Sequence, residues 1–227
     1  MSGVLLTDDI AVEGCSPPGG VVAVWTLNRP EKLNALNRDS HLAIKEQCVR
    51  VESDDTVRAV VIRGAAPPTP EEGERPKPAA FAAGADISEF AGKNSDDVRE
   101  FFANNAWEAI WGLSKPTIAM VDGFALGGGT ELALACDLRV ASTRAKFGQP
   151  EINLGLIPGG GGTQRLCRLL GYGKAMEMTL TGEMVGAEEA LSIGLVNKVV
   201  EPEELEVEAL ALAENIAKKS PYTVKVA

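Results

Sequence analysis

The chain alternates between short apolar runs and stretches in which apolar residues recur at helical spacing. Residues 21–27 (VVAVWTL) and 57–64 (VRAVVIRG) are rich in β-branched residues and predict two strands. Residues 39–52 predict an amphipathic helix between them. The apolar members of that helix are Leu42, Ile44, Cys48 and Val51.

The same alternation continues to the end of the chain. A helix is predicted over about 96–113, where Asp96 and Asp97 suit the positive end of the helix dipole. Further strands are predicted at 117–123, 137–142 and 195–200, and further helices after the glycine run at 159–162, at 172–182, at 187–194 and at 202–219. Strands that alternate with helices predict an α/β fold.

Residues 65–78 (AAPPTPEEGERPKP) interrupt this pattern. The segment is rich in proline and charge and has almost no apolar residues. It therefore predicts an exposed loop without regular structure.

Composition narrows the function classes. The chain has 227 residues, 45% hydrophobic and 24% charged, which is typical of a globular enzyme with a sizeable core. A formal charge of −10 and the lack of a basic stripe argue against a nucleic-acid partner. The apolar runs are too short to predict a membrane span, and the acidic N-terminus resembles neither a signal nor a transit peptide. We expect a cytoplasmic protein.

Histidine and cysteine offer little catalytic chemistry. The sole histidine, His41, has no neighbouring ligand at metal spacing, so we expect neither a metal site nor a Ser-His-Asp triad. The cysteines are widely separated and predict reduced thiols that mostly fill the core; they are Cys15, Cys48, Cys136 and Cys167. Acid–base chemistry must then come from carboxylates, lysines or backbone groups.

The segment 123–137 (GFALGGGTELALACD) combines a glycine triplet with Glu131 inside an apolar helical run. Neither this segment nor the tetraglycine at 159–162 has the spacing of a phosphate-binding loop. Bare backbone N–H groups at a helix start suit a developing oxyanion. A packing turn, with Glu131 on a solvated face, is an equally good interpretation of the pattern alone.

Two more segments, around Glu151 and at residues 80–87, also allow both a functional and a structural interpretation. Glu151 lies in a loop (FGQPEINLG) flanked by apolar residues, where an exposed loop acid is the simpler interpretation. Residues 80–87 (AFAAGADI) are small and suit close approach of backbone, either to a ligand or to neighbouring protein.

Five segments, in order, resemble the signature segments of the enoyl-CoA hydratase (crotonase) family. They are NRPEKLNALN (28–37), AFAAGADISEF (80–90), GFALGGGTELALACDLRVAS (123–142), FGQPEINLGLIPGGGGTQRL (147–166) and LTGEMVGAEEALSIGLVNKVV (180–200). The resemblance runs from about residue 20 to the end. It implies an α/β fold of the crotonase type, a spiral of ββα units with C-terminal helices. Residues 1–200 would form the spiral core and 201–227 the start of a helical trimerisation region that the family pattern continues further.

The resemblance also implies the catalytic groups. The backbone N–H groups of Ala85 and Gly128 would bind the thioester oxygen of an acyl-CoA, and Glu131 and Glu151 would hold and activate one water. We favour Glu131 as the base toward water and Glu151 as the acid at C2. Related isomerases, decarboxylases and dehalogenases replace at least one of these acids, so their joint presence favours hydration of an enoyl-CoA in acyl-CoA degradation.

Contacts with coenzyme A are implied for several further positions. Those in the first two segments are Lys32, Leu33, Ala35, Ala83, Asp86 and Ile87; the others are Leu126, Gly127, Pro150 and Gly159, with Leu156 also near the acyl group. Lys32 is equally an ordinary surface lysine, and Leu126, Pro150 and Leu156 are equally core residues. Gly159 is expected to begin a helix near Glu151.

The remaining implications concern partners. The family implies an acyl-CoA thioester as substrate, no separate cofactor because coenzyme A is part of the substrate, and a homotrimer or a hexamer made of two trimers. An isomerase or a specialised 3-hydroxyacyl-CoA dehydratase is the alternative within the family. A non-catalytic, RNA-binding relative is the alternative of another class, and the acidic composition and the two glutamates argue against it.

Overall fold

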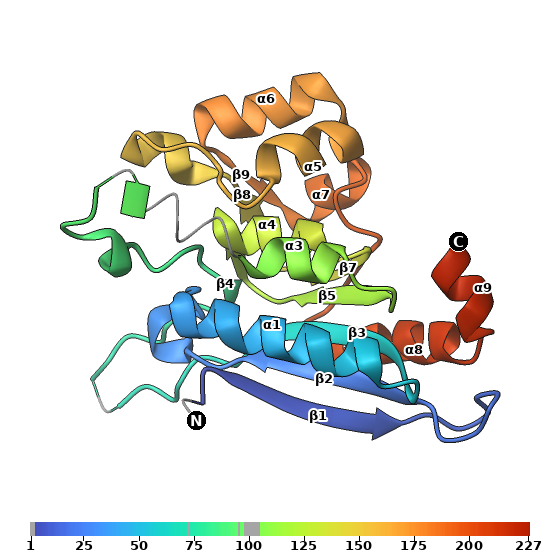
Figure 1. Cartoon of the computed structure of the whole chain (residues 1–227). Helices are drawn as coiled ribbons and strands as arrows, with labels where there is room; N and C mark the ends of the chain where they lie inside the picture. The colour runs from blue at the N-terminus through green and yellow to red at the C-terminus, as the bar shows by residue number, and fades with distance from the viewer. Residues whose placement is uncertain (1–2, 72, 95, 98–104) are drawn as a thin grey trace.

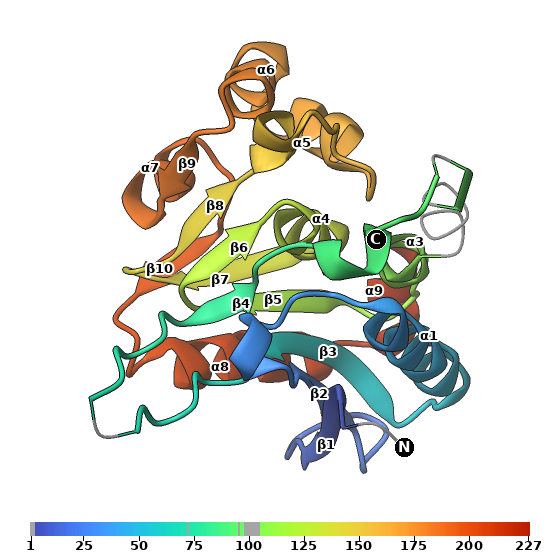
Figure 2. The same cartoon turned by 90° about the vertical axis from the view of Figure 1, so that its left-hand side faces the viewer.

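The computed structural model describes residues 3–71, 73–94, 96–97 and 105–227. Two sheets form the frame (Figures 1 and 2). The larger contains, in spatial order, β1 (Leu5–Ala11), β2 (Val21–Leu27), β3 (Val57–Gly64), β5 (Thr117–Val121), β7 (Leu138–Ser142) and β10 (Lys198–Val200). The smaller contains β4 (Ala80–Ala82), β6 (Phe124–Leu126), β8 (Lys146–Gly148) and β9 (Met184–Gly186).

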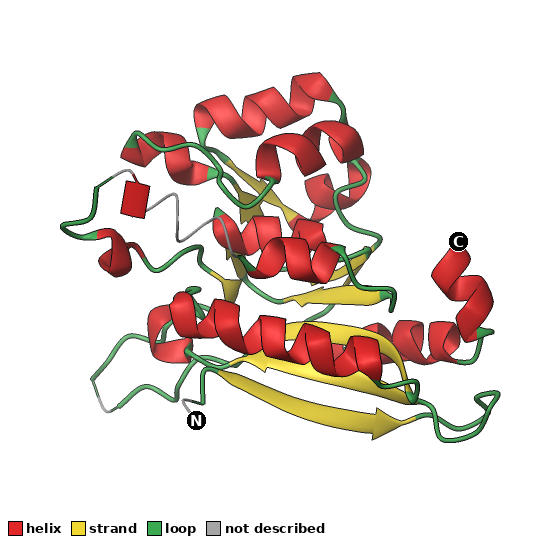
Figure 3. Cartoon of the chain, viewed as in Figure 1, coloured by secondary structure: helices red, strands yellow, loops and turns green. Residues whose placement is uncertain are grey.

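Helices cover these sheets and lie between them (Figure 3). They are α1 (Arg38–Ser53), α3 (Ala106–Trp111), α4 (Gly128–Ala135), α5 (Gly162–Leu170), α6 (Tyr172–Thr181), α7 (Ala187–Ser192), α8 (Leu205–Ala217) and α9 (Pro221–Val226). Short 3₁₀ turns are η1 (Pro30–Lys32), η2 (Ile87–Phe90) and η3 (Pro150–Leu154). None of the helices in the described ranges has the length and apolar character needed to span a membrane.

The chain winds as a spiral. Strand β3 of the larger sheet is followed by β4 of the smaller sheet and then α3, and β5, β6 and α4 repeat this order. Strands β7 and β8 begin a third turn, which continues through η3 into α5 and α6. In the larger sheet β3, β5 and β7 pair in parallel, as do β4, β6 and β8 in the smaller sheet, whereas β1 pairs with β2 and β8 with β9 in antiparallel fashion. This arrangement confirms the predicted α/β spiral of ββα units.

Both faces of the larger sheet are buried at its central strands β2, β3, β5 and β7, which explains their continuous apolar runs. On β2, Trp25 and its alternate neighbours face a core shared with α1, α3 and α4. Val22 and Val24 face a second core, to which α8 contributes Leu205, Ala209, Ala213 and Ala217. Helix α8 therefore packs directly on the sheet.

Most predicted elements are confirmed. The strands at 21–27 and 57–64 have the predicted bounds, and the predicted helix at 39–52 extends by one residue at each end. The described residues of 65–78 contain no helix or strand (Figure 3). The helix predicted over 96–113 is confirmed at 106–111, while residues 98–104 lie outside the described ranges.

Candidate active site

The glycine triplet forms a tight turn from β6 into α4. Gly127 has φ +50° and ψ −123°, a conformation that residues with a side chain rarely adopt. An alanine at Gly129 would place its Cβ 1.9 Å from the carbonyl oxygen of Ala82. The triplet thus serves both the turn and the close packing of α4 on β4.

Two backbone amides lie side by side at this turn. A Cβ on Gly128 would lie 3.3 Å from the Ala85 nitrogen, and a Cβ on Gly84 would lie 3.8 Å from the Gly128 nitrogen. Gly128 begins α4, so its N–H has no acceptor within the helix. Neither amide donates a hydrogen bond to any group in the described part of the chain. Two adjacent N–H groups of this kind could both donate to one negatively charged oxygen.

The direction of the Ala85 amide follows from a single β-bridge. Leu36 N donates to Gly84 O, and Asp86 N donates to Leu36 O, both at 2.8 Å. Successive peptide groups of an extended chain point to opposite sides. The Ala85 N–H is therefore directed away from the 28–37 segment and toward α4.

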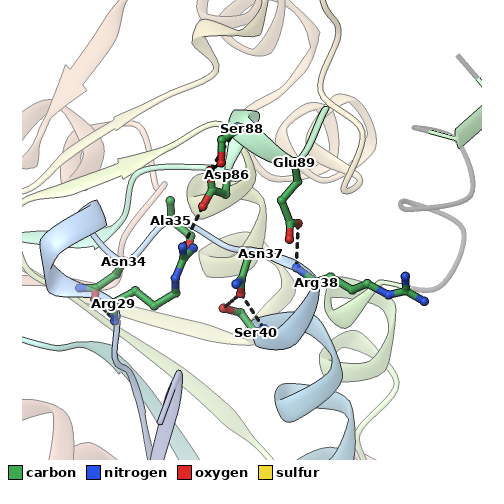
Figure 4. A network of polar contacts seen from close by, with 9 residues as sticks. All are labelled: Arg29, Asn34, Ala35, Asn37, Arg38, Ser40, Asp86, Ser88 and Glu89. Carbon is green, nitrogen blue, oxygen red and sulfur yellow. Dashed lines mark hydrogen bonds and ion pairs between the residues drawn. The ribbon is translucent and has the colours of Figure 1, made fainter. Parts of the chain in front are cut away.

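A polar network holds the bridge (Figure 4). Arg29 donates to Ala35 O at 2.7 Å and to Asp86 Oδ2 at 2.8 Å, and the two charged side chains are only 15% and 12% exposed. Asp86 Oδ1 accepts from Ser88, and this hydrogen bond, reinforced by Arg29, lowers the pKa of the Asp86 carboxyl. The segment that carries Ala85 is thus held from two sides.

Asn34 is the second anchor of this network. Leu33 and Asn34 have φ values of 52° and 55°, which asparagine tolerates better than leucine. Asn34 accepts from Arg29 N at 3.0 Å, and its amide donates to Ala65 O at 3.0 Å and Ala80 O at 2.8 Å. The latter two residues flank the proline-rich loop, so one buried side chain closes the base of that loop.

Glu131 lies one turn into α4 and is 1% exposed. Its Oε1 accepts hydrogen bonds from Gly160 N at 2.7 Å and Gly162 N at 2.8 Å. Burial raises the pKa of Glu131, while the two N–H groups and nearby Arg165 act in the opposite direction. Its Oε2 accepts no hydrogen bond from the described residues.

The tetraglycine is shaped around this carboxylate. A Cβ on Gly160 would lie 2.7 Å from Glu131 Oε2, and a Cβ on Gly162 would lie 3.0 Å from Oε1. Helix α5 begins at Gly162, so the expectation that Gly159 begins it is wrong. Gly161 has a left-handed conformation, with φ +100°, and precedes the first residue of α5. The amides of Gly160 and Gly162 on either side of it point toward Glu131.

Glu151 lies in η3 and is partly buried. Burial, with repulsion from Glu131 as a smaller cause, raises its pKa to about 7. The Gln149 side-chain amide is fully buried, and one end of it lies 3.0 Å from both carboxylate oxygens of Glu151; with its nitrogen at that end it would donate to both. A Cβ on Gly127 would lie 2.9 Å from Glu151 Oε1, so Glu151 lies directly against the glycine triplet.

The residues predicted to contact coenzyme A lie on several different elements. Lys32 is exposed at the end of η1, Leu33 O accepts from Ala83 N, and Ile87 is exposed at the start of η2. Leu126 ends β6 and Pro150 begins η3 beside Glu151, whereas Gly159 and Leu156 are exposed in the following loop. Their contacts with a substrate stay predictions.

His41 has a structural environment. It is buried, its Nδ1 accepts from Ala106 N at 3.2 Å, and its ring meets the Trp107 ring edge-on at 4.7 Å. Burial lowers its pKa to about 4, so the imidazole is neutral at physiological pH. The described residues contain no cluster of three His, Cys, Asp or Glu side chains that would hold a metal ion.

Three contributors to the site were not predicted from the sequence. They are Gln149, which contacts Glu151, Arg165, which donates to Gly160 O at 2.6 Å, and Trp107, which donates to Gly128 O at 2.9 Å. For Gln149 the signal was its place two residues before Glu151. Trp107 and Arg165 carry no comparable local signal.

Comparisons with known proteins agree with this geometry. The family model described as enoyl-CoA hydratase/isomerase matches residues 18–227. The short-chain-enoyl-CoA hydratase of Clostridium acetobutylicum is 47% identical over 209 residues, which cover 91% of this chain and 76% of that protein. The crotonyl-CoA hydratase of Syntrophomonas wolfei is 44% identical over 207 residues, covering 90% and 75%.

Solved structures give the same result. The enoyl-CoA hydratase from Bacillus anthracis superposes with a TM-score of 0.85 at 37% identity, covering 98% of this chain and 80% of that one. DspI of Pseudomonas aeruginosa superposes with a TM-score of 0.87 at 35% identity, covering 99% and 84%. In sequence and in architecture, the chain belongs to the enoyl-CoA hydratase/isomerase family.

Proposed function

We propose that this chain is an enoyl-CoA hydratase, which adds water reversibly to a trans-2-enoyl-CoA and gives a 3-hydroxyacyl-CoA. The observation that carries the proposal is the convergence of two carboxylates, Glu131 and Glu151, on the glycine turn that presents two unbonded backbone amides. Relatives named for crotonyl-CoA and for short-chain enoyl-CoA favour a short acyl group.

The amide pair would stabilise the charge that develops during addition. When the water oxygen adds at C3 of the enoyl thioester, electron density moves onto the thioester oxygen and forms an enolate. The N–H groups of Ala85 and Gly128 would donate to that oxygen. Loss of one donor of this kind typically lowers the rate about 100- to 1000-fold.

The two glutamates differ in a way that supports separate roles. Glu131 Oε1 accepts two N–H groups, which oppose the rise in pKa that burial causes, and Oε2 is left for a proton from water. Glu151, with a pKa of about 7, retains a proton near neutral pH and can deliver it to C2. Water then contributes hydroxide at C3 while Glu151 contributes hydrogen at C2. Exchange with solvent then removes the proton from Glu131 and returns one to Glu151.

This chemistry requires only proton transfer and charge stabilisation, so we propose no separate cofactor. The coenzyme A part of the substrate would lie along the 28–37 and 83–87 segments. A homotrimer or hexamer is supported by a group of exposed apolar side chains beside the site; they are Ile152, Leu154, Leu156 and Ile157. We also propose a cytoplasmic location.

The test follows loss of the enoyl-thioester absorbance of crotonyl-CoA. We expect turnover by the unaltered protein and a fall of about 100- to 10,000-fold in kcat for both Glu131→Gln and Glu151→Gln. Glu214→Gln on α8 is the matched control and should retain full activity. Absence of turnover by folded protein that still binds coenzyme A would overturn the proposal and favour the isomerase alternative.

A further inference from the structure

Trp107 on α3 occupies an unusual position behind the proposed site. It is fully buried, and its indole N–H donates to Gly128 O at 2.9 Å. Gly128 is also the residue whose own N–H faces the proposed thioester oxygen. The indole therefore fixes the position of a peptide unit directly attached to one oxyanion donor.

The same ring also contacts the group that holds Glu131. An alanine at Gly160 would place its Cβ 2.5 Å from Trp107 Cδ2 and 2.7 Å from Glu131 Oε2. The Gly160 amide donates to Glu131 Oε1. One face of the indole is thus packed against the loop that orients the proposed base, and its Cζ2 lies close to Gly128.

Helix α3 holds this arrangement in place from behind. His41 accepts from Ala106 N and packs edge-on against Trp107. On the same helix, Glu108 pairs with Arg165, whose other nitrogen donates to Gly160 O at 2.6 Å. The Arg165 guanidinium also lies 4.8 Å from the centre of the Trp111 ring.

We infer that Trp107 is a positioning residue that sets the spacing between the oxyanion donor at Gly128 and the base at Glu131. The inference rests on the proposed hydration reaction. Charge stabilisation and proton removal occur in one transition state, so the N–H of Gly128 and the carboxylate of Glu131 must keep a fixed separation. A single rigid ring in contact with both peptide segments fulfils that requirement.

The chain offers a matched control. Trp25 on β2 is also fully buried, but its indole nitrogen has no hydrogen-bond partner in the described residues. Trp25→Phe and Trp107→Phe remove the same atoms from the same core. A merely structural role of Trp107 predicts equal effects of the two changes on kcat.

We expect Trp107→Phe to lower kcat for crotonyl-CoA about tenfold with KM changed less than about twofold, since one neutral hydrogen bond is lost near the reacting atoms. Trp25→Phe should stay within about twofold of the unaltered kcat. Trp107→Phe should lower Tm more than Trp25→Phe, because only Trp107→Phe removes a hydrogen bond. A bound dienoyl-CoA, whose absorption moves to longer wavelength when its carbonyl is polarised, should show a smaller shift in Trp107→Phe only.

If Trp107→Phe does not fold, replacement of Trp107 by 3-benzothienylalanine keeps the bicyclic ring and exchanges the N–H for a sulfur atom that cannot donate a hydrogen bond. It should reproduce the lower kcat and the smaller spectral shift. Equal kcat in the two Phe variants, or an unchanged spectral shift with either residue at position 107, would overturn the inference. Failure of the unaltered protein to hydrate crotonyl-CoA would instead overturn the proposed function, so the two failures are distinguishable.

Discussion

A single methyl group at Gly160 tests how tightly the site is built. In Gly160→Ala, the new Cβ would lie 2.5 Å from Trp107 Cδ2 and 2.7 Å from Glu131 Oε2. Ordinary contacts of these kinds need about 3.5 Å or more, so the ring, the carboxylate or the loop must move by about 1 Å. Each of these movements separates groups that the proposed reaction requires together.

The expected effects on stability and activity differ in size. Overpacking a tight core costs about 1–3 kcal/mol. An alanine also lowers the entropy of the unfolded chain, which raises the free energy of unfolding by about 0.4–1 kcal/mol. This gain applies because Gly160 is not among the glycines with positive φ. The free energy of unfolding should therefore fall by about 0–2.6 kcal/mol. A displacement of about 1 Å should lower kcat about 100-fold.

Gly173→Ala is the control for this change. Gly173 lies in α6, its φ is not positive, and a Cβ added to it would meet no atom within 4 Å. The free energy of unfolding of this variant should rise by about 0.4–1 kcal/mol, and its kcat should not change. Urea unfolding and crotonyl-CoA turnover measure both quantities. Full kcat in folded Gly160→Ala would refute the close coupling of the tetraglycine to Glu131.

Three further outcomes follow from the same geometry. Because Glu151 has a pKa of about 7 and must be protonated to serve C2, kcat for hydration should fall about tenfold per pH unit above that value; a flat profile to pH 9 would contradict its role as acid. Asp86→Asn should weaken the bond to Arg29 and lower the free energy of unfolding by about 1–3 kcal/mol at pH 7. Because folding lowers the pKa of Asp86, this loss of stability should shrink as the pH falls through that pKa. Equal losses in urea unfolding at pH 7 and pH 3 would contradict this expectation. A Gly/Ser linker in place of residues 67–76 should leave kcat within about threefold, because Asn34 holds both ends of the loop; a 100-fold loss would assign the loop a part in the site.

Apolar patterning predicted the long elements because both faces of their sheet are buried. Strand β1 was missed because it lies at the edge of that sheet, and its exposed Asp8 and Asp9 interrupt any apolar alternation. Strands β6, β8 and β9 have three residues each, too few to show a period. The smaller sheet therefore could not be predicted from periodicity.

The site was only partly predictable. The glycine triplet and Glu131 raised the question of an oxyanion site, and the resemblance of five segments selected the answer. What no local pattern reports is the contact between distant residues. Trp107 and Gly128 are 21 positions apart, and Glu131 is 29 positions from Gly160. The left-handed conformation of Leu33 was equally invisible, since the neighbouring Asn34 is held by hydrogen bonds to the distant Ala65 and Ala80.

The most direct test of the central claim is the fate of the atoms of water. Crotonyl-CoA should be incubated with the protein in ¹⁸O-labelled D₂O, and the product analysed by mass spectrometry and NMR. The two-carboxylate mechanism predicts one ¹⁸O at C3 and one deuterium at C2 of 3-hydroxybutyryl-CoA. A product with a shifted double bond, deuterium but no ¹⁸O would contradict hydration and identify an isomerase.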